Sequence, residues 1–354
     1  MRKVIPFVLV MLLFCTGSYA QVSMDPDECV HVRVVDCGAA LCCVVTMPDD
    51  HYMIYDGGHW QNDCAIETVR ELIPAGSTID LMVISHSDAD HLGAIDEICD
   101  EYDVDCVLRT GYERSTASWR NANEAIVNET DCTDYNLTKM DEDPSLPQLD
   151  FGDTWSFGDV DVTFVCGWSE CPQDWRSELT SSEERNAISI VTRLEYKGHS
   201  ILFTGDTVGR GIGDSFTKCI AAEKYMIDNS CDVCIDSDVL VGQHHGGDNA
   251  SSYDFICAVS PMYVVYSAGH MHDHPTEGCF DRCSTYLTNV AGRDCCSYFR
   301  TDWGDDEHGY EAEYGSGYGD TTADDDVDIW LFDDPAHDPQ VCWLRNDIDP
   351  HLRP

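Results

Sequence analysis

Three short segments of the chain carry residue types that bind metal ions. The first reads His86-Ser87-Asp88-Ala89-Asp90-His91, the second contains Asp206, and the third reads His244-His245-Gly246. Each follows a short apolar run, which predicts a buried strand. Because loops at one edge of a sheet can converge, we expect these imidazoles and carboxylates to meet around bound metal.

The spacing of the first segment indicates that one loop serves two metal ions. In a tight loop, His86 and Asp88 can face one metal, while Asp90 and His91 face a second. A surface segment rarely combines two histidines and two aspartates in this order directly after an apolar strand. The sequence therefore predicts a site for two divalent metal ions.

The elements that position these loops are expected to alternate between short strands and a few helices. Helices are predicted after His91 and at residues 65–72, and residues 327–332 are predicted to form a late strand. Residues 115–149 and 302–326 are polar and acidic, so we interpret them as irregular insertions. The other strands are predicted at residues 30–35, 42–47, 52–55, 81–84, 160–165, 188–194, 200–203, 239–241 and 262–266.

The order of the motifs resembles the metallo-β-lactamase superfamily and, within it, the hydrolase domain of ComEC-type competence proteins. The resemblance covers most of the chain after residue 20 and implies an α/β fold, the four-layer αββα sandwich. It rests on segments that match this branch in order: residues 34–38 and 53–58, the loop 86–94, the pair 186–191 and 202–206, the segment 244–246, residues 266–269 with His274-Pro275, and residues 300–302.

The resemblance, together with donor chemistry, implies a ligand for each metal position. His86 and Asp88 are assigned to one metal, and Asp206 is expected to bridge both ions. The other metal is assigned to Asp90, His91 and His244, with His245 as the competitor of His244.

Five residues are expected to support the ligands or the reaction. Asp56 is expected to orient a ligand imidazole, the alternative being a turn residue before Gly57-Gly58. Asn186 and His245 are expected to lie behind the ligands. Asp90 and His274 are the catalytic candidates, although His274 could equally be a loop residue beside Pro275.

Two departures from the family pattern concern the first metal position. Asp88 stands where the superfamily at large has histidine, and a carboxylate is a harder ligand, so manganese is an alternative to the expected zinc. No histidine occurs between His91 and His199, and Asn186 is nearest in motif order to the missing one. We therefore expect this position to be the weaker of the two.

The implied reaction is hydrolysis, in which a metal-bound hydroxide attacks a phosphorus or acyl centre. The histidine pair, Asp88 and the closing segment with His274 resemble the competence branch more than the lactamases, and this resemblance implies a phosphodiester or other phosphoester as substrate rather than a β-lactam. The alternative is a catalytically silent secreted protein that binds a partner, suggested by the missing histidine. Metal content would discriminate between the two.

The amino terminus predicts export. Arg2 and Lys3 precede an apolar run at residues 4–14 and Ser18-Tyr19-Ala20, the pattern of a signal peptide that is removed after residue 20. The run is shorter than the roughly 20 residues of a membrane span, so no membrane association is expected after cleavage. We expect a secreted or periplasmic protein with a hydrolase domain at residues 21–334 and a tail at 335–354.

Composition supports export and limits the partners. Of the 20 cysteines, 19 lie outside the leader, and disulfides are the first expectation, with half of a zinc site as the alternative for Cys231-x-x-Cys234. The chain has 20 basic and 66 acidic residues, a net charge of −46, which becomes 18 − 66 = −48 without Arg2 and Lys3. Tight nucleic-acid binding at low salt is therefore disfavoured, and we expect a small-molecule or phosphodiester substrate.

Overall fold

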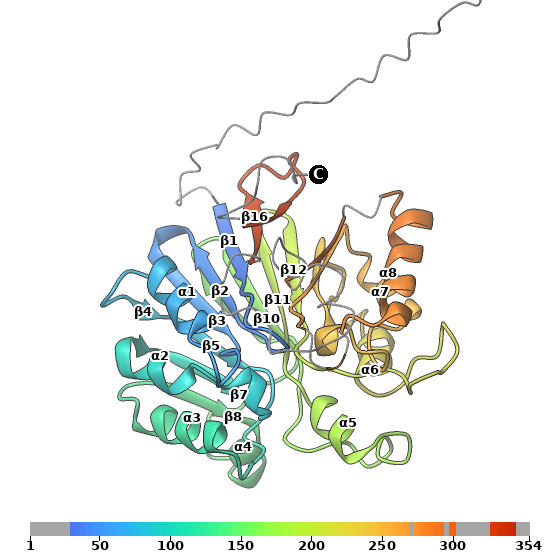
Figure 1. The fold of residues 1–354 in the computed structure, drawn as a ribbon. Helices are drawn as coiled ribbons and strands as arrows, with labels where there is room; N and C mark the ends of the chain where they lie inside the picture. Colours follow the sequence, from blue (N-terminus) through green and yellow to red (C-terminus); the bar gives the residue numbers. More distant parts are fainter. Residues whose placement is uncertain (1–28, 270–271, 273, 294–296, 302–325, 345–354) are drawn as a thin grey trace, which may run out of the picture.

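The computed structural model describes residues 29–269, 272, 274–293, 297–301 and 326–344 (Figure 1). The predicted leader, residues 302–325 of the predicted acidic insertion and residues 345–354 of the predicted tail lie outside the described residues. Within the described residues, no helix combines the length and the apolar character that a membrane crossing requires.

Two large β-sheets face each other. The first has eight strands in the order β17 (Gln340–Trp343), β16 (Val327–Phe332), β1 (Cys29–Val34), β2 (Cys43–Met47), β3 (His51–Tyr55), β5 (Leu81–Ile84), β7 (Cys106–Arg109) and β8 (Thr133–Asn136). The second has seven, in the order β15 (Tyr298–Arg300), β14 (Tyr263–Tyr266), β13 (Val239–Val241), β12 (His199–Phe203), β11 (Val191–Tyr196), β10 (Val160–Cys166) and β9 (Thr154–Phe157). A small parallel pair joins β4 (Thr78–Ile79) and β6 (Asp103–Val104).

Helices cover the outer face of each sheet (Figure 1). On the first sheet, α1 and α2 bury Ile66 and Ile95 with Ile54 of β3. On the second sheet, α7 buries Phe255 with Leu240 of β13. The eight helices of the described residues are α1 (Cys64–Leu72), α2 (Ile95–Glu101), α3 (Ala117–Asn128), α4 (Leu137–Glu142), α5 (Ser181–Asn186), α6 (Ala221–Asp228), α7 (Tyr253–Val259) and α8 (Glu277–Asn289).

The core confirms the expected four-layer αββα sandwich. One apolar cluster lies between the sheets and joins side chains such as Val32 and Met53 of the first sheet to Phe203 and Val241 of the second. Two further clusters lie between each sheet and its helices. Three apolar interfaces separate four layers, as this architecture requires.

Parallel pairing at the centre of each sheet brings the motif loops together. Strand β3 pairs parallel to β5, and β12 pairs parallel to β13, which pairs parallel to β14. Such strands are buried on both faces, which explains why their sequences are continuous apolar runs instead of alternating ones. The loops that leave their carboxyl ends carry Asp56, the His86 segment, Asp206 and the His244 segment.

Two expectations need correction. Residues 115–149 are not an irregular insertion, because they form α3, capped by Thr116, then β8 and α4. Strand β17 lies inside the expected tail and pairs with β16, because its residues complete the edge of the first sheet. The described cysteines, Cys42, Cys43, Cys231, Cys234, Cys279 and Cys283 among them, are thiols in this structure, and the expected disulfides stay a prediction.

Candidate metal centre

Asp206 lies between two groups of histidines and directs one carboxylate oxygen at each group. Its Oδ1 is 3.2 Å from His91 Nε2 and 3.4 Å from His245 Nε2. Its Oδ2 is 3.8 Å from His86 Nε2 and 3.9 Å from His244 Nε2. This is the geometry of a carboxylate that can bridge two metal positions.

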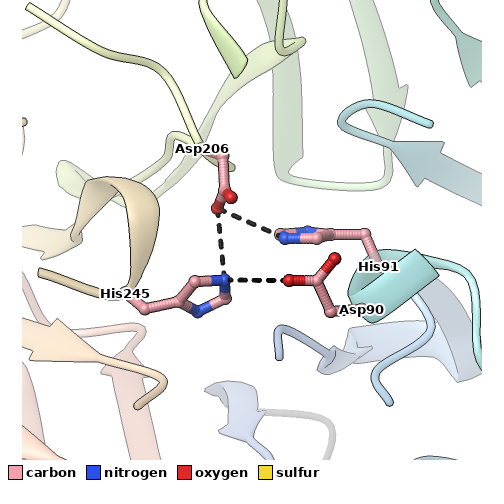
Figure 2. Close-up of side chains that lie close together, drawn as sticks. All are labelled: Asp90, His91, Asp206 and His245. Atoms are coloured by element: carbon pink, nitrogen blue, oxygen red, sulfur yellow. Dashed lines mark ion pairs between the residues drawn. The ribbon is translucent and has the colours of Figure 1, made fainter. Parts of the chain in front are cut away.

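Asp206, the two histidines near its Oδ1 and Asp90 form a compact cluster of four ligands (Figure 2). One ligand atom from each of Asp90, His91, Asp206 and His245 lies within 4.8 Å of the others. Asp90 reaches the cluster through His245, whose Nε2 is 3.8 Å from Asp90 Oδ2. Two carboxylates and two imidazoles suit a divalent ion such as zinc or manganese.

Buried polar atoms in the cluster lack hydrogen-bond partners. Among the described residues, no hydrogen bond satisfies Nε2 of His86, His91 or His245, or Oδ1 of Asp206. Leaving such groups unpaired costs about 1–3 kcal/mol each, and these atoms point at a common space. The residues present therefore fit the bound metal that the sequence predicted.

Asp56 sets the orientation of the His91 ring. The carboxylate is fully buried and accepts the Nδ1 proton of His91 at 2.8 Å. It also accepts the Ser85 backbone N–H and the Ser85 hydroxyl, each at 2.7 Å. Because that hydroxyl donates to Asp56, it must accept from His86 Nδ1, which lies 3.1 Å away. Both rings consequently present an Nε2 lone pair to the site.

The remaining two histidines are fixed in the same tautomer. His245 Nδ1 donates to the Ser267 carbonyl at 2.9 Å, and His244 Nδ1 donates to Asn249 Oδ1 at 2.7 Å. His244 Nε2 accepts from Asn186 Nδ2 at 3.0 Å. Nε2 of His86, His91 and His245 is thus open to metal, whereas a metal at His244 Nε2 would replace the hydrogen bond from Asn186.

The electrostatics keep His86, His245 and Asp206 in their metal-binding protonation states. Burial lowers the pKa of His86 to about 3, and the neighbouring His91 adds to this effect. Burial also lowers the pKa of His245. Burial opposes ionisation of Asp206, but the surrounding imidazoles hold its pKa well below its usual range. His91 differs, since Asp206 and Asp56 raise its pKa against the effect of burial. A metal at Nε2 would replace the proton there.

The motif loops are joined by short backbone contacts. The Ile190 N–H donates to the Ser85 carbonyl at 2.8 Å, and the His244 N–H donates to the Gly205 carbonyl at 3.0 Å. Gly205 has φ +50°, and a Cβ there would lie 2.5 Å from the Ser85 side chain. Only glycine allows the Asp206 loop to approach the His86 loop this closely.

The structure arranges two predicted ligands differently from their assignment. His245, expected to lie behind the ligands, belongs to the four-residue cluster, whereas His244 faces the other oxygen of Asp206. Asp88 pairs with Arg114, its Oδ1 lying 2.5 Å from Nη1, and with Arg185 at 3.5 Å. Two guanidinium groups attract this carboxylate, whereas the sequence assigned Asp88, together with His86, to the metal position outside this cluster.

The other candidates lie near the centre. Asn186 contacts His244, and Asp56 contacts His91, as residues that support ligands. The ring of His274 lies 5.5 Å from that of His244, and burial, then His244, lowers its pKa to about 3. His274 is therefore a neutral imidazole at the edge of the site.

Sequence reasoning missed residues that orient the site. Ser85 links Asp56 to His86, and its position directly before the motif was the available signal. Ser267 supplies a backbone carbonyl, a role that side-chain chemistry does not reveal. Arg185 directly precedes Asn186 in a chain with few basic residues, and this scarcity could have drawn attention to it.

Comparison with known proteins supports the resemblance that the motifs predicted. No protein-family model matches the chain. The competence protein ComA of Neisseria gonorrhoeae is 26% identical over 278 residues, 77% of this chain and 32% of ComA, so the chain spans about a third of that relative. Similar solved structures include the metallo-β-lactamase fold protein YhfI from Bacillus subtilis, with 12% identity, a TM-score of 0.44, and coverage of 77% of this chain and 95% of YhfI. CmlA, a diiron β-hydroxylase from Streptomyces venezuelae, has 14% identity, a TM-score of 0.45, and coverage of 78% and 53%.

Proposed function

We propose that the chain is a metal-dependent hydrolase of phosphodiesters that uses two divalent ions, zinc first and manganese as the alternative. The observation that carries this proposal is the placement of Asp206, whose two oxygens face separate groups of Nε2 atoms. His91, His245 and Asp90 would hold one ion, and His86 and His244 would hold the other.

The metal supplies the activation of water. A divalent ion lowers the pKa of a coordinated water towards 7 and polarises the group under attack. Asp206 keeps its negative charge between the positions and would reduce the repulsion between two cations. Buried hydrogen bonds from Asp56, Ser267 and Asn249 hold the imidazoles in place before metal arrives.

Two side chains are placed to act on the substrate. The Asp90 side chain is 31% exposed, against 5% for Asp206, so it is the ligand that faces the opening. A carboxylate there can accept a proton from the attacking water. His274 is neutral and its buried Nδ1 has no hydrogen bond among the described residues, so it can contact the substrate.

Phosphodiester chemistry is favoured by the motif resemblance and by the arginines beside the site. Arg114 and Arg185 meet at Asp88, two positions before the ligand Asp90 in the chain, although only 20 of the 354 residues are lysine or arginine. A single diester needs only this local positive charge, whereas a long polyanion would meet the acidic surface. We further propose that the chain is exported and that its thiols form disulfides in an oxidising compartment.

The test compares hydrolysis of bis(4-nitrophenyl) phosphate with that of a chromogenic cephalosporin. The full chain is stripped of metal, reconstituted with zinc or manganese, and analysed for metal content. We expect two bound ions and diester cleavage well above lactam cleavage. Ready lactam cleavage with an intact diester would refute the substrate class. A dialysed protein that binds no metal and regains no activity would favour the silent binding protein.

A matched pair of variants tests the bridge. Asp206→Asn should lose both ions and the activity, because an amide is neutral and a weak ligand. Asp238→Asn is the control, since Asp238 accepts the Ser200 N–H at 2.8 Å at the opposite end of β12. Full activity in Asp206→Asn would remove the two-metal proposal.

A further inference from the structure

A pocket of about 240 Å³ opens beside the metal cluster. The ligand Asp90 forms part of its wall, so a molecule in the pocket would lie next to the metal position. His59, Trp60, Asp88 and Arg114 also line it. The pocket therefore combines an acidic edge, a guanidinium and an exposed aromatic surface.

The aromatic side of the pocket is a solvent-exposed stack. The Trp60 side chain lies on the His59 ring, with centroids 4.0 Å apart and planes inclined by 21°. Trp60 is nevertheless 48% exposed, so one large part of its surface remains free. Burial lowers the pKa of His59, which keeps this ring neutral and suited to stacking. A planar ring could extend the stack from the open side.

The positively charged side of the pocket is formed by Arg114, which is paired with Asp88. Arg114 Nη1 lies 2.5 Å from Asp88 Oδ1, and Arg185 Nε lies 3.5 Å from the same oxygen. The Arg185 Nε atom is buried and has no hydrogen bond among the described residues. Arg114 lines the pocket, whereas Arg185 does not and donates through its Nη atoms to the Ser181 carbonyl and the Ser182 hydroxyl. A phosphate in the pocket would therefore offer acceptor oxygens to Arg114.

We propose that this pocket selects phosphodiesters that carry a planar aromatic group, with Trp60 stacking on the ring and Arg114 binding a phosphate oxygen. In the empty pocket Arg114 is paired with Asp88, and the phosphate of the substrate takes the place of Asp88. The inference rests on the proposed hydrolase function and adds its specificity. The ring can belong to a simple aryl group or to a nucleobase, since both stack on an indole face.

The first test measures binding to the zinc-loaded full chain by calorimetry. Phenylphosphonate and methylphosphonate serve as probes that share the anion and differ in the ring. Trp60→Ala should weaken phenylphosphonate binding by about tenfold and leave methylphosphonate unchanged, while Trp60→Phe should retain most of the affinity. Phe216→Ala, which removes another exposed aromatic side chain (41% exposed), is the control. Equal affinity of the wild type and Trp60→Ala for phenylphosphonate would overturn the inference.

A second pair of variants tests the displaced anion. Arg114→Gln should weaken both probes by about tenfold, because a charge-assisted hydrogen bond is lost. Asp88→Asn should retain zinc and bind both probes more tightly, because Arg114 is released. Loss of zinc in Asp88→Asn would make Asp88 a metal ligand and overturn the displacement.

Kinetics separate this inference from the proposed function. The ring that stacks on Trp60 is the one on the ester oxygen that is not cleaved. Trp60→Ala should therefore raise KM for bis(4-nitrophenyl) phosphate without lowering kcat, and leave ethyl 4-nitrophenyl phosphate, whose only ring is on the leaving group, unaffected. Thymidine 5′-(4-nitrophenyl) phosphate distinguishes a nucleobase from a simple aryl group by the size of the Trp60 effect. Binding that depends on Trp60 without hydrolysis of any diester would refute the function and support the pocket. Diester hydrolysis with a KM that Trp60→Ala leaves unchanged would support the proposed function and refute the role of the pocket.

Discussion

Replacing Asp56 with asparagine should impair metal binding through the tautomer of His91. The Asp56 carboxylate accepts three donors: the Ser85 N–H and hydroxyl at 2.7 Å each, and the His91 Nδ1 proton at 2.8 Å. Asparagine offers one acceptor oxygen and one donor group in nearly the same shape. It can satisfy the backbone N–H only by turning its NH₂ group towards Ser85 Oγ and His91.

The expected outcome is a proton moved from one ring nitrogen of His91 to the other. The reverse amide orientation would place the NH₂ group against the buried Ser85 N–H, at a cost of about 1–3 kcal/mol. With the favoured orientation, His91 Nδ1 becomes the acceptor and Nε2 carries the proton. That proton points at Asp206 Oδ1, 3.2 Å from Nε2, where the metal is expected. We expect metal affinity to fall by about 10- to 100-fold, as for other partners of metal-binding histidines.

The assay is a competitive titration of zinc against a chelating dye, with the His91 tautomer read from ¹⁵N chemical shifts. Asp80→Asn is the matched control, because Asp80 accepts from His51 Nδ1 at 2.8 Å and from the Tyr52 N–H at 2.8 Å, outside the metal centre. The control should retain wild-type zinc affinity. If Asp56→Asn also binds zinc with unchanged affinity, the assignment of His91 as an Nε2 ligand oriented by Asp56 is refuted.

Two further predictions concern packing and pH. Gly93→Ala should destabilise the fold by about 1–3 kcal/mol and weaken zinc binding, because a Cβ there would lie 2.4 Å from the His59 carbonyl carbon and displace the adjacent His91 loop; unchanged thermal unfolding would contradict this. Burial raises the pKa of Asp326 to about 7 in the folded protein. The folded state is therefore most stable with this carboxyl protonated, and its contribution to the free energy of unfolding is fully present below about pH 4 and is lost as the pH rises through 7. Between pH 4 and 8, the free energy of unfolding of Asp326→Asn in urea should rise by up to about 4 kcal/mol relative to that of the wild type. If the free energies of unfolding of the two proteins change in parallel with pH, the effect is excluded.

The sequence by itself determined the central elements of the fold and the types of ligand. Strands β5, β12 and β13 were predictable because a parallel strand buried on both faces needs an unbroken apolar run. The donors at their ends were visible because ligands on one loop are neighbours in sequence. Segment 115–149 was misjudged because the period of α3 and the short strand β8 are weak against many polar residues.

Only the tertiary structure decided what each donor faces. His244 and His245 are adjacent and chemically identical in sequence, but their left-handed backbone, with φ of 47° and 54°, sends them to different oxygens of Asp206. Asp88 was predicted as a ligand from local spacing, yet Arg114 and Arg185 lie 26 and 97 positions away and attract it electrostatically. Sequence separation contains no information about such partners, because Arg114 meets Asp88 only once β7 has paired with β5, and Arg185 reaches it from a segment that precedes the second sheet's strand β11.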